Sequence, residues 1–335
     1  MAKIAVLGAG SWGIGVSILL HSNKHKISLW EFNTQDMLDL KKKREHKSKL
    51  PGIRIPEDIG ITDKLDDAVK EAELLALALP SHTVRDVAKK LSQISLDKPL
   101  IVNLAKGIEN DTLCRMSEIL SQELPENLHK KIITLSGPCH AEEVARKMPT
   151  SVVVAGLDGE AVKEAQEIFM NRFFRVYTGD DLVGTELGGS LKNVIAIASG
   201  ICDGLNLGDN AKGALLTRGL AEMVRLGEKL GANPLTFAGL SGMGDLITTC
   251  LSKYSRNRYV GEQIGRGKTL KATLEGMVMV AEGVKTTKSA YDLCMKHKVE
   301  MPITRQVYRI LYENLEPGKA LAELMTREPK SEIWS

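Results

Sequence analysis

The segment GAGSWG at residues 8–13 is the feature of this chain that most restricts its fold. It follows an apolar run at residues 4–7 and precedes a stretch with helical spacing, so the G-x-G-x-x-G pattern stands at a strand-to-helix turn. In this pattern Gly8 permits a tight turn, Gly10 lets the backbone approach a pyrophosphate, and Gly13 lets the helix pack closely on the strand. An ordinary glycine turn is the alternative. The flanking elements, and the acidic Glu31 after the next strand-like run, favour a dinucleotide site.

Periodicity divides the chain into two halves, as its 335 residues also suggest. Strand-like runs alternate with helical stretches up to about residue 178, which predicts parallel strands in a doubly wound sheet. Beyond Tyr177 only helical spacing remains, with Asp180 or Asp181 as an N-cap and Gly231 as a C-cap. We expect an α/β Rossmann-type domain over residues 1–179 and an all-helical domain over residues 180–335. The predicted strands cover residues 3–7, 26–30, 74–79, 100–104, 132–135, 151–154 and 173–177.

Composition excludes several classes of function. A net charge of +3 is too small to indicate a nucleic-acid partner, and the basic run 41–49 is interpreted as a solvated helix end, with a specific anion site as the alternative. No apolar run is long enough for membrane insertion, and the start of the chain has no secretory pattern, so we expect a cytoplasmic protein. The five cysteines are scattered and indicate reduced thiols rather than a metal site.

Glu31 bears on the choice of nicotinamide cofactor. A carboxylate at the end of the second strand accepts hydrogen bonds from an unmodified ribose and repels a 2′-phosphate. Its immediate neighbours offer no cation, although residues 41–44 can fold back toward it. NAD is therefore the predicted cofactor, with NADP possible and a plain surface carboxylate as the alternative.

Three charged residues stand in unusual surroundings. Lys192 is the only charge between Glu186 and Asp203, and its helical neighbours are small or apolar, which predicts room for a ligand beside it. Lys106 follows a predicted strand, at the edge of the sheet where ligands bind. Asp245 is the only charged residue in GLSGMGDLITT, so a buried Asp245 requires a cation beside it. The alternatives are that Lys192 reaches water from a helix interface, that Lys106 is a surface lysine, and that Asp245 is a helix N-cap.

Two polar segments are further candidates. In YSRNR, residues 254–258, Arg256 offers a planar fork suited to phosphate, and a solvated helix start is the alternative. In SGPCHAEE, residues 136–143, a Gly-Pro turn precedes a predicted helix start, and a simple turn is the alternative.

Together these segments resemble the bacterial NAD(P)-dependent glycerol-3-phosphate dehydrogenase family. The resemblance runs nearly end to end through GAGSWG, LAKGIE, SGP with HAEEVA, LGGSLKNVIAI, GLSGMGDLITTC, YSRNR and VAEGVKT. It implies an oxidoreductase that interconverts sn-glycerol 3-phosphate and dihydroxyacetone phosphate for phospholipid biosynthesis, and a homodimer. Another dehydrogenase of similar architecture and a nucleotide-binding protein without turnover are the rival interpretations. A hydrolase that uses Cys139 is set aside, because no residue is placed to orient His140.

The resemblance also implies roles for individual residues. Lys192 would be the general acid/base, with Lys106 and Asp245 beside it. The expected substrate ligands are Lys106, Gly137, Cys139, Asn193, Asp245, Thr249, Ser255, Arg256 and Asn257. The expected cofactor contacts are Gly8, Gly10, Ser11, Trp12, Gly13, Glu31, Lys106, Ala141, Arg256, Val280 and Glu282.

Two positions depart from what is expected. Position 139 more often carries a hydroxyl residue in this family, and the Cys139 thiol is a weaker hydrogen-bond partner. Gly15 should reduce helix stability unless a close packing contact requires it.

The residues support a mechanism for ketone reduction. Negative charge develops on the ketone oxygen, and Lys192 can donate a proton to it. We expect burial and the nearby Lys106 to lower the pKa of Lys192, and Asp245 to oppose this while it orients both lysines.

Overall fold

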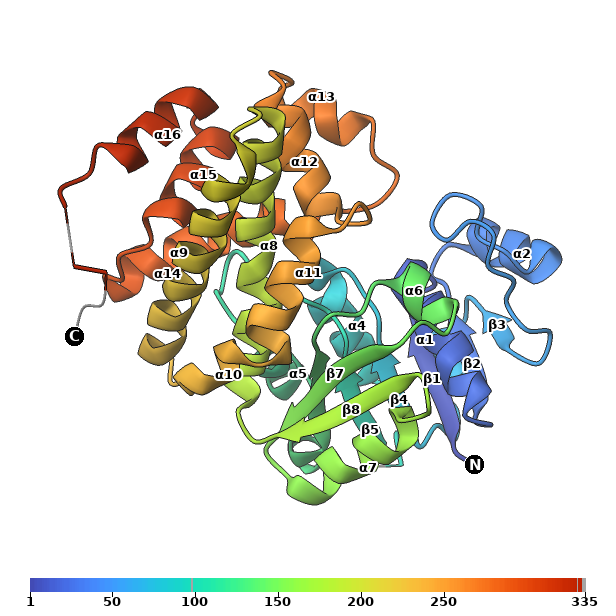
Figure 1. The fold of residues 1–335 in the computed structure, drawn as a ribbon. Helices are drawn as coiled ribbons and strands as arrows, with labels where there is room; N and C mark the ends of the chain where they lie inside the picture. Colours follow the sequence, from blue (N-terminus) through green and yellow to red (C-terminus); the bar gives the residue numbers. More distant parts are fainter. Residues whose placement is uncertain (98, 330, 333–335) are drawn as a thin grey trace.

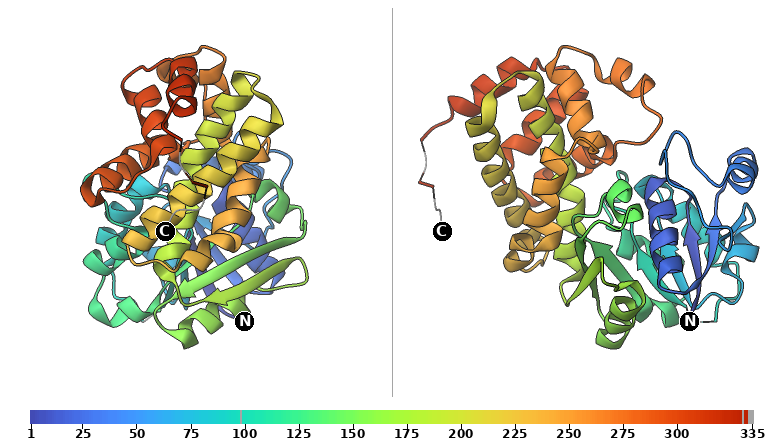
Figure 2. Two further views of the ribbon diagram at one scale, coloured as in Figure 1. Left: turned by 60° about the vertical axis from the view of Figure 1, so that its left-hand side comes forward. Right: turned by 45° about the vertical axis from the view of Figure 1, so that its right-hand side comes forward.

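An eight-stranded sheet forms the first half of the molecule, and the helical half lies beside it (Figures 1 and 2). The computed structural model describes residues 1–97, 99–329 and 331–332. Its strands stand in the order β3-β2-β1-β4-β5-β6-β7-β8. The predicted change from α/β to helical structure is confirmed, because each element that the structure describes after β8 is a helix. The strands are β1 Lys3–Leu7, β2 Lys26–Trp30, β3 Gly60–Thr62, β4 Leu74–Leu77, β5 Leu100–Asn103, β6 Ile132–Ser136, β7 Thr150–Gly156 and β8 Phe174–Gly179.

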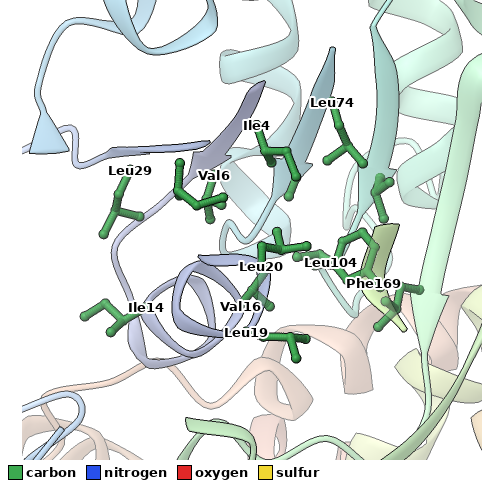
Figure 3. Close-up of a cluster of buried hydrophobic side chains, with 14 of the residues drawn as sticks. Ile4, Val6, Ile14, Val16, Leu19, Leu20, Leu29, Leu74, Leu104 and Phe169 are labelled. Carbon is green, nitrogen blue, oxygen red and sulfur yellow. The ribbon is translucent and has the colours of Figure 1, made fainter. Parts of the chain in front are cut away.

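Side chains from both faces of the sheet are buried, as the apolar strands predict. In β1, Ile4 and Val6 belong to one core cluster, whereas Ala5 and Leu7 belong to another on the opposite face. Figure 3 shows the first cluster, in which β1 packs against Ile14 and other residues of α1. The helices of this half are α1 Ser11–Ser22, α2 Thr34–Lys43, α3 Leu65–Val69, α4 Val84–Leu91, α5 Met116–Glu123, α6 Ala141–Ala145 and α7 Gly159–Phe169, with short 3₁₀ turns η1 Ser81–Thr83 and η2 Glu126–Lys131.

The sheet corrects two expectations. The strands are not all parallel, because β7 pairs antiparallel with β6. The link between them carries only the short α6, which packs against α1, whereas a parallel return needs a crossover long enough to span the sheet. The second correction is β3 at the sheet edge, which the prediction missed because three residues provide no hydrophobic run.

The turn between β1 and α1 has the local geometry expected of its glycines. Gly8 has φ +105°, a conformation that residues with side chains rarely adopt. A Cβ on Gly13 would lie 1.8 Å from the carbonyl oxygen of Gly8, so only glycine fits there. A Cβ on Gly10 would meet nothing within 4 Å, so open space borders the N-terminus of α1.

The helical half is built around α8 Leu182–Gly204, which runs through its middle (Figure 1). Two glycines bring α12 against it: a Cβ on Gly200 would lie 1.9 Å from the Arg258 carbonyl oxygen, and one on Gly261 would lie 1.9 Å from that of Ile197. Among the described residues, none of the helices has the combination of length and apolar character needed to cross a membrane. The other elements are α9 Gly208–Lys229, α10 Pro234–Ala238, the π-helical η3 Leu240–Gly244, α11 Asp245–Leu251, α12 Arg256–Gly265, α13 Leu270–Glu275, α14 Glu282–His297, α15 Pro302–Tyr312 and α16 Pro317–Met325.

Helix ends follow the predicted capping residues. Asp181 is the N-cap of α8, and its carboxylate accepts a hydrogen bond from the Gly184 amide at 2.8 Å. Gly231, with φ +87°, follows the end of α9 as predicted. The basic run begins at the end of α2, also as predicted, but Arg44 is turned inward, where its guanidinium donates to the Ile59 carbonyl oxygen at 2.8 Å.

A buried carboxylate fixes α8 to the sheet half. Glu186 is 5% exposed and accepts hydrogen bonds from the backbone amide and hydroxyl of Ser117, at 2.8 and 2.6 Å. The guanidinium of Arg115 donates to the same carboxylate at 2.6 Å. Since α8 also carries Lys192, these contacts set the position of that lysine relative to the sheet.

Two glycines of α1 predict opposite responses to a methyl group. Gly13→Ala should lower the free energy of unfolding by about 1–3 kcal/mol or more, because its Cβ would overlap the Gly8 carbonyl. Gly15→Ala should raise it by about 0.5–1 kcal/mol, because its Cβ would meet Ala141 at 3.4–3.6 Å, an ordinary contact, and alanine favours the helix. Urea unfolding of both variants measures the difference. Equal effects would contradict this account of the turn.

Candidate active site

Two lysines, one from each half of the chain, share one buried carboxylate. Lys192 Nζ lies 2.7 Å from Asp245 Oδ1, and Lys106 Nζ lies 2.7 Å from Asp245 Oδ2. Lys192 is 6% exposed, so it is not a lysine that reaches water, and Lys106 is not a surface lysine. The capping alternative for Asp245 is wrong, because Gly244 is the N-cap of α11 and the Asp245 carboxylate accepts from both ammonium groups. The sequence-based requirement for a cation is confirmed.

The two glycines that precede Lys192 leave no ligand space on their own sides of α8, which corrects the expectation for these two residues. A Cβ on Gly188 would lie 2.6 Å from the carbonyl oxygen of Ser241, so the backbone of η3 fills that side of α8. A Cβ on Gly189 would lie 2.6 Å from the Ser136 hydroxyl and 3.5 Å from Cγ of Lys106. These close approaches are what bring Lys106 and Asp245 to Lys192.

The three charges change one another's pKa values. Burial lowers the pKa of Lys192, and the nearby Lys106 ammonium lowers it further, against the opposing effect of Asp245. Burial also acts to lower the pKa of Lys106, but the Asp245 carboxylate outweighs it and the pKa is raised. For Asp245 burial acts upward, and the two lysines hold the pKa below its ordinary value. Lys192 is thus the lysine whose proton is more readily released, as the sequence predicted.

Thr249 and the loop after β6 complete the surroundings of the lysines. Thr249 Oγ1 accepts a hydrogen bond from Lys192 at 2.5 Å, and the Gly137 carbonyl oxygen accepts one from Lys106 at 3.0 Å. Gly137 has φ +126°, which fits the predicted Gly-Pro turn. The Cys139 thiol donates to that same carbonyl at 3.0 Å and lies 3.5 Å from Lys106 Nζ. Burial raises the pKa of Cys139, so it carries a proton rather than a reactive thiolate.

The YSRNR segment starts α12, and its residues are buried or half-buried rather than solvated. Ser255 is the N-cap, and its hydroxyl accepts from the Arg258 amide at 3.2 Å. Asn257 is 7% exposed: its amide donates to Asn193 at 2.8 Å, and its oxygen accepts from the Gly283 amide at 2.9 Å. Asn193 and Asn257 therefore join α8, α12 and α14, whichever substrate contacts they make besides.

Arg256, between those two residues, is different. Its guanidinium makes no hydrogen bond or ion pair with any residue that the structure describes. Burial lowers the pKa of Arg256, and the carboxylates of Glu282 and Glu142 act in the opposite direction. A half-buried cation without a partner is suited to an anionic ligand.

The expected dinucleotide site lies at the N-terminus of α1. Open space beside Gly10 and a glycine turn that brings backbone amides forward fit a pyrophosphate there. Ser11 is 8% exposed and Trp12 half-buried, and α6, which begins at Ala141, packs against α1. These residues form one region, and their contacts with a cofactor stay predictions.

Glu31 stands directly after β2, at the carboxyl edge of the sheet, and is buried. Its carboxylate accepts from the Asn33 amide at 3.1 Å. Burial raises the pKa of Glu31, with Lys49 acting in the opposite direction. The plain surface-carboxylate alternative is wrong, and the cation that acts on the pKa of Glu31 is Lys49 rather than one of residues 41–44.

Glu282 opens α14 and reaches the sheet half. Its carboxylate accepts from the Ser81 hydroxyl at 2.5 Å and from the Ser81 amide at 3.2 Å. Val280, two residues earlier, is 40% exposed. The sequence interpretation missed Ser81, although it follows a predicted strand at the same sheet edge that singled out Lys106.

Comparison with known proteins gives a consistent result. The family model for the N-terminus of NAD-dependent glycerol-3-phosphate dehydrogenase matches residues 3–162, and the model for its C-terminus matches residues 181–322. The chain is 49% identical over 335 residues to glycerol-3-phosphate dehydrogenase [NAD(P)+] of Fusobacterium nucleatum, covering 100% of both chains, and 50% identical over 331 residues to that of Thermoanaerobacter sp., covering 99% of both. The crystal structure of glycerol-3-phosphate dehydrogenase from Coxiella burnetii superposes with a TM-score of 0.92 at 35% identity, covering 97% of this chain and 99% of the other.

The buried charge cluster predicts a pH-dependent loss of stability on removal of its carboxylate. Asp245→Asn should lower the free energy of unfolding by roughly 3 kcal/mol at neutral pH, because it leaves two buried ammonium groups without a counter-ion. Since the pKa of Asp245 is lowered in the folded state, its contribution is complete above the ordinary aspartate value of about 3.9 and is lost as the pH falls below it. Urea unfolding between about pH 3 and pH 7 measures the difference from the parent protein.

Asp39→Asn is the matched control, because it removes an exposed carboxylate that pairs with Lys43 at 2.5 Å. Its effect should stay below about 0.5 kcal/mol throughout. An Asp245→Asn difference no larger than this control would show that the pairing contributes nothing to stability.

Proposed function

The chain belongs to the NAD-dependent glycerol-3-phosphate dehydrogenase family, and from this premise we propose how its own residues carry out the reaction. The family's oxidoreductase activity interconverts sn-glycerol 3-phosphate and dihydroxyacetone phosphate with NAD(P). Membership argues against a nucleotide-binding protein without turnover and against a hydrolase. The reaction requires a bound hydride donor, a proton donor at the ketone and a ligand for the phosphate, and different residues of the site supply each of these.

The observation that carries the residue assignment is the contrast between the site's cations. Lys192 and Lys106 share Asp245 at the centre, while the Arg256 guanidinium at the start of α12 has no partner among the described residues. A phosphorylated ketone requires both features: a proton donor at its carbonyl and a cation for its phosphate. We assign the ketone end to Lys192 and Lys106 and the phosphate end to Arg256, with Ser255, Asn257, Asn193, Thr249, Gly137 and Cys139 around the substrate.

The lysines divide the chemistry of reduction between them. A bound NAD(P), its pyrophosphate at the glycine turn and with Ser11, Trp12, Ala141, Val280 and Glu282 nearby, would supply the hydride. Lys192, whose pKa is lowered by burial and by Lys106, donates the proton to the ketone oxygen. Lys106, whose pKa is raised, stays an ammonium and stabilises the developing negative charge. Asp245 holds both in place. In the oxidation direction Lys192 accepts the proton.

The wider context is also proposed. We assign residues 1–179 to a dinucleotide-binding domain and residues 180–335 to a substrate-binding and dimerisation domain, with the boundary between β8 and α8. The family resemblance supports a cytoplasmic homodimer that supplies glycerol 3-phosphate for phospholipid synthesis.

Lys192→Met tests the catalytic role. The variant keeps the length of the buried side chain but removes the proton, so kcat should fall by about 10²- to 10⁴-fold. Affinity for NADH, measured by fluorescence titration, should stay near that of the parent protein, because Lys192 lies at the substrate end. The exposed Lys89→Met on α4 is the control and should leave kcat unchanged. Turnover retained within a few-fold in Lys192→Met would remove this residue from catalysis.

We propose that NAD is preferred over NADP because of Glu31. Its buried carboxylate, oriented by the Asn33 amide, stands where a ribose hydroxyl can donate to it and where a 2′-phosphate would be repelled. Arg44, the one arginine in the basic run, is turned toward the Ile59 carbonyl oxygen and does not offset this charge.

The test is kcat/KM for NADH against NADPH. NADH should be favoured by about tenfold or more, and Glu31→Gln should reduce the ratio by removing the repulsion. Because burial raises the pKa of Glu31, the ratio should also fall as the pH is lowered and the carboxylate takes up a proton. A preference for NADPH in the parent protein would overturn the assignment.

A further inference from the structure

We propose that Ser81 is a positioning residue that keeps the Glu282 carboxylate from pairing with Arg256 and so leaves the Arg256 guanidinium available to the substrate phosphate. Ser81 belongs to the short turn η1 after β4, and none of the residues assigned above includes it. The inference rests on the proposed role of Arg256 and names the contact that preserves that role.

Ser81 donates a hydrogen bond to each oxygen of the Glu282 carboxylate. The backbone amide donates to Oε1 at 3.2 Å and the hydroxyl donates to Oε2 at 2.5 Å. Two donors from one residue fix both the position and the rotation of a carboxylate. Hydrogen bonds to an ionised acceptor are also among the stronger ones in proteins. Glu282 is therefore held on the sheet half although it belongs to α14.

The loop that carries Lys106 is shaped around this contact. A Cβ on Gly107 would lie 2.5 Å from both the Cβ and the hydroxyl oxygen of Ser81, and 3.6 Å from Oε2 of Glu282. Only glycine at position 107 leaves Ser81 in place. Three segments therefore meet at this contact: the turn after β4 with Ser81, the loop after β5 with Gly107, and the start of α14 with Glu282.

Glu282 and Arg256 stand at the starts of two helices that contact each other, because the Gly283 amide of α14 donates to Asn257 Oδ1 of α12 at 2.9 Å. The Glu282 carboxylate raises the pKa of Arg256 more than Glu142 does, yet no ion pair within 4.0 Å joins Glu282 and Arg256. A half-buried guanidinium beside a mobile carboxylate would form that pair, since Arg–carboxylate pairs are bidentate and favourable where water is scarce. The two hydrogen bonds from Ser81 oppose this pairing. Loss of the hydroxyl should release the carboxylate to compete with the phosphate.

Steady-state kinetics with dihydroxyacetone phosphate at saturating NADH test the proposal. Ser81→Ala should raise KM for dihydroxyacetone phosphate by roughly tenfold and change kcat by less than threefold, because the reacting lysines are not involved. Thr83→Ala is the matched control from the same turn: among the described residues the Thr83 hydroxyl bonds only the Pro80 carbonyl oxygen, at 2.9 Å, and the KM of this variant should match that of the parent protein. An unchanged KM in Ser81→Ala overturns the proposal.

The double variant separates positioning from a general structural role. Glu282→Gln removes the competing charge, so Ser81→Ala should have no effect on KM for dihydroxyacetone phosphate when introduced into a Glu282→Gln background. A merely structural serine would raise KM equally in both backgrounds, which would overturn the proposal. The comparison also applies if Ser81→Ala alone is unstable, because Gly107→Ala displaces the same hydroxyl and should give the same dependence on Glu282.

Arg256→Gln distinguishes this inference from the proposed function. If Arg256→Gln raises KM for dihydroxyacetone phosphate and Ser81→Ala does not, the phosphate role stands and only the positioning role of Ser81 fails. If Arg256→Gln leaves KM unchanged, the phosphate role itself fails, and the proposal for Ser81 fails with it.

Discussion

A single buried carboxylate between two ammonium groups is the interaction on which the site depends. Asp245 is 2% exposed and Lys192 6% exposed, so each would be costly to bury alone. One carboxylate cannot neutralise two cations, and a net positive charge remains. Burial and this residual charge together separate the two lysines: burial and the neighbouring ammonium lower the pKa of Lys192, whereas the Asp245 carboxylate keeps the pKa of Lys106 raised. The same imbalance that makes the cluster expensive to fold gives it one proton donor and one fixed cation.

The cluster forms only because backbones approach closely around it. Its members come from the loop after β5, from α8 and from the start of α11, and glycines occupy the contacts between these elements. Gly188 lets η3 touch α8, and Gly189 admits Ser136 and Lys106. Along the same helix, Gly200 admits α12, which carries Arg256. The small residues of α8 therefore determine the distances between charges that lie far apart in the sequence.

The sequence predicted the parts of the structure whose causes are local. The glycine turn, Asp181 as an N-cap and the change to helices after Tyr177 each depend on neighbouring residues. An isolated Asp245 among apolar residues correctly predicted a paired cation, because an unpaired buried charge is too costly. The antiparallel β7 and the three-residue β3 depend on packing across the sheet, which no local pattern records. The glycines beside Lys192 misled for the same reason: small residues permit either a ligand or another backbone, and only the fold decides between them.

Lys192 is paired with a carboxylate in this site, whereas Arg256 is not, and the difference reflects the function of each cation. A lysine that exchanges protons in a buried place needs a counter-ion to remain there, which Asp245 provides. A guanidinium that binds a phosphate must instead be kept from a neighbouring carboxylate, because an internal ion pair would have to break at each encounter. Glu282 satisfies this requirement while its carboxylate is held in place, and the two hydrogen bonds from Ser81 hold it. The loop after β4 therefore influences substrate binding without contact with the substrate, through the carboxylate it restrains.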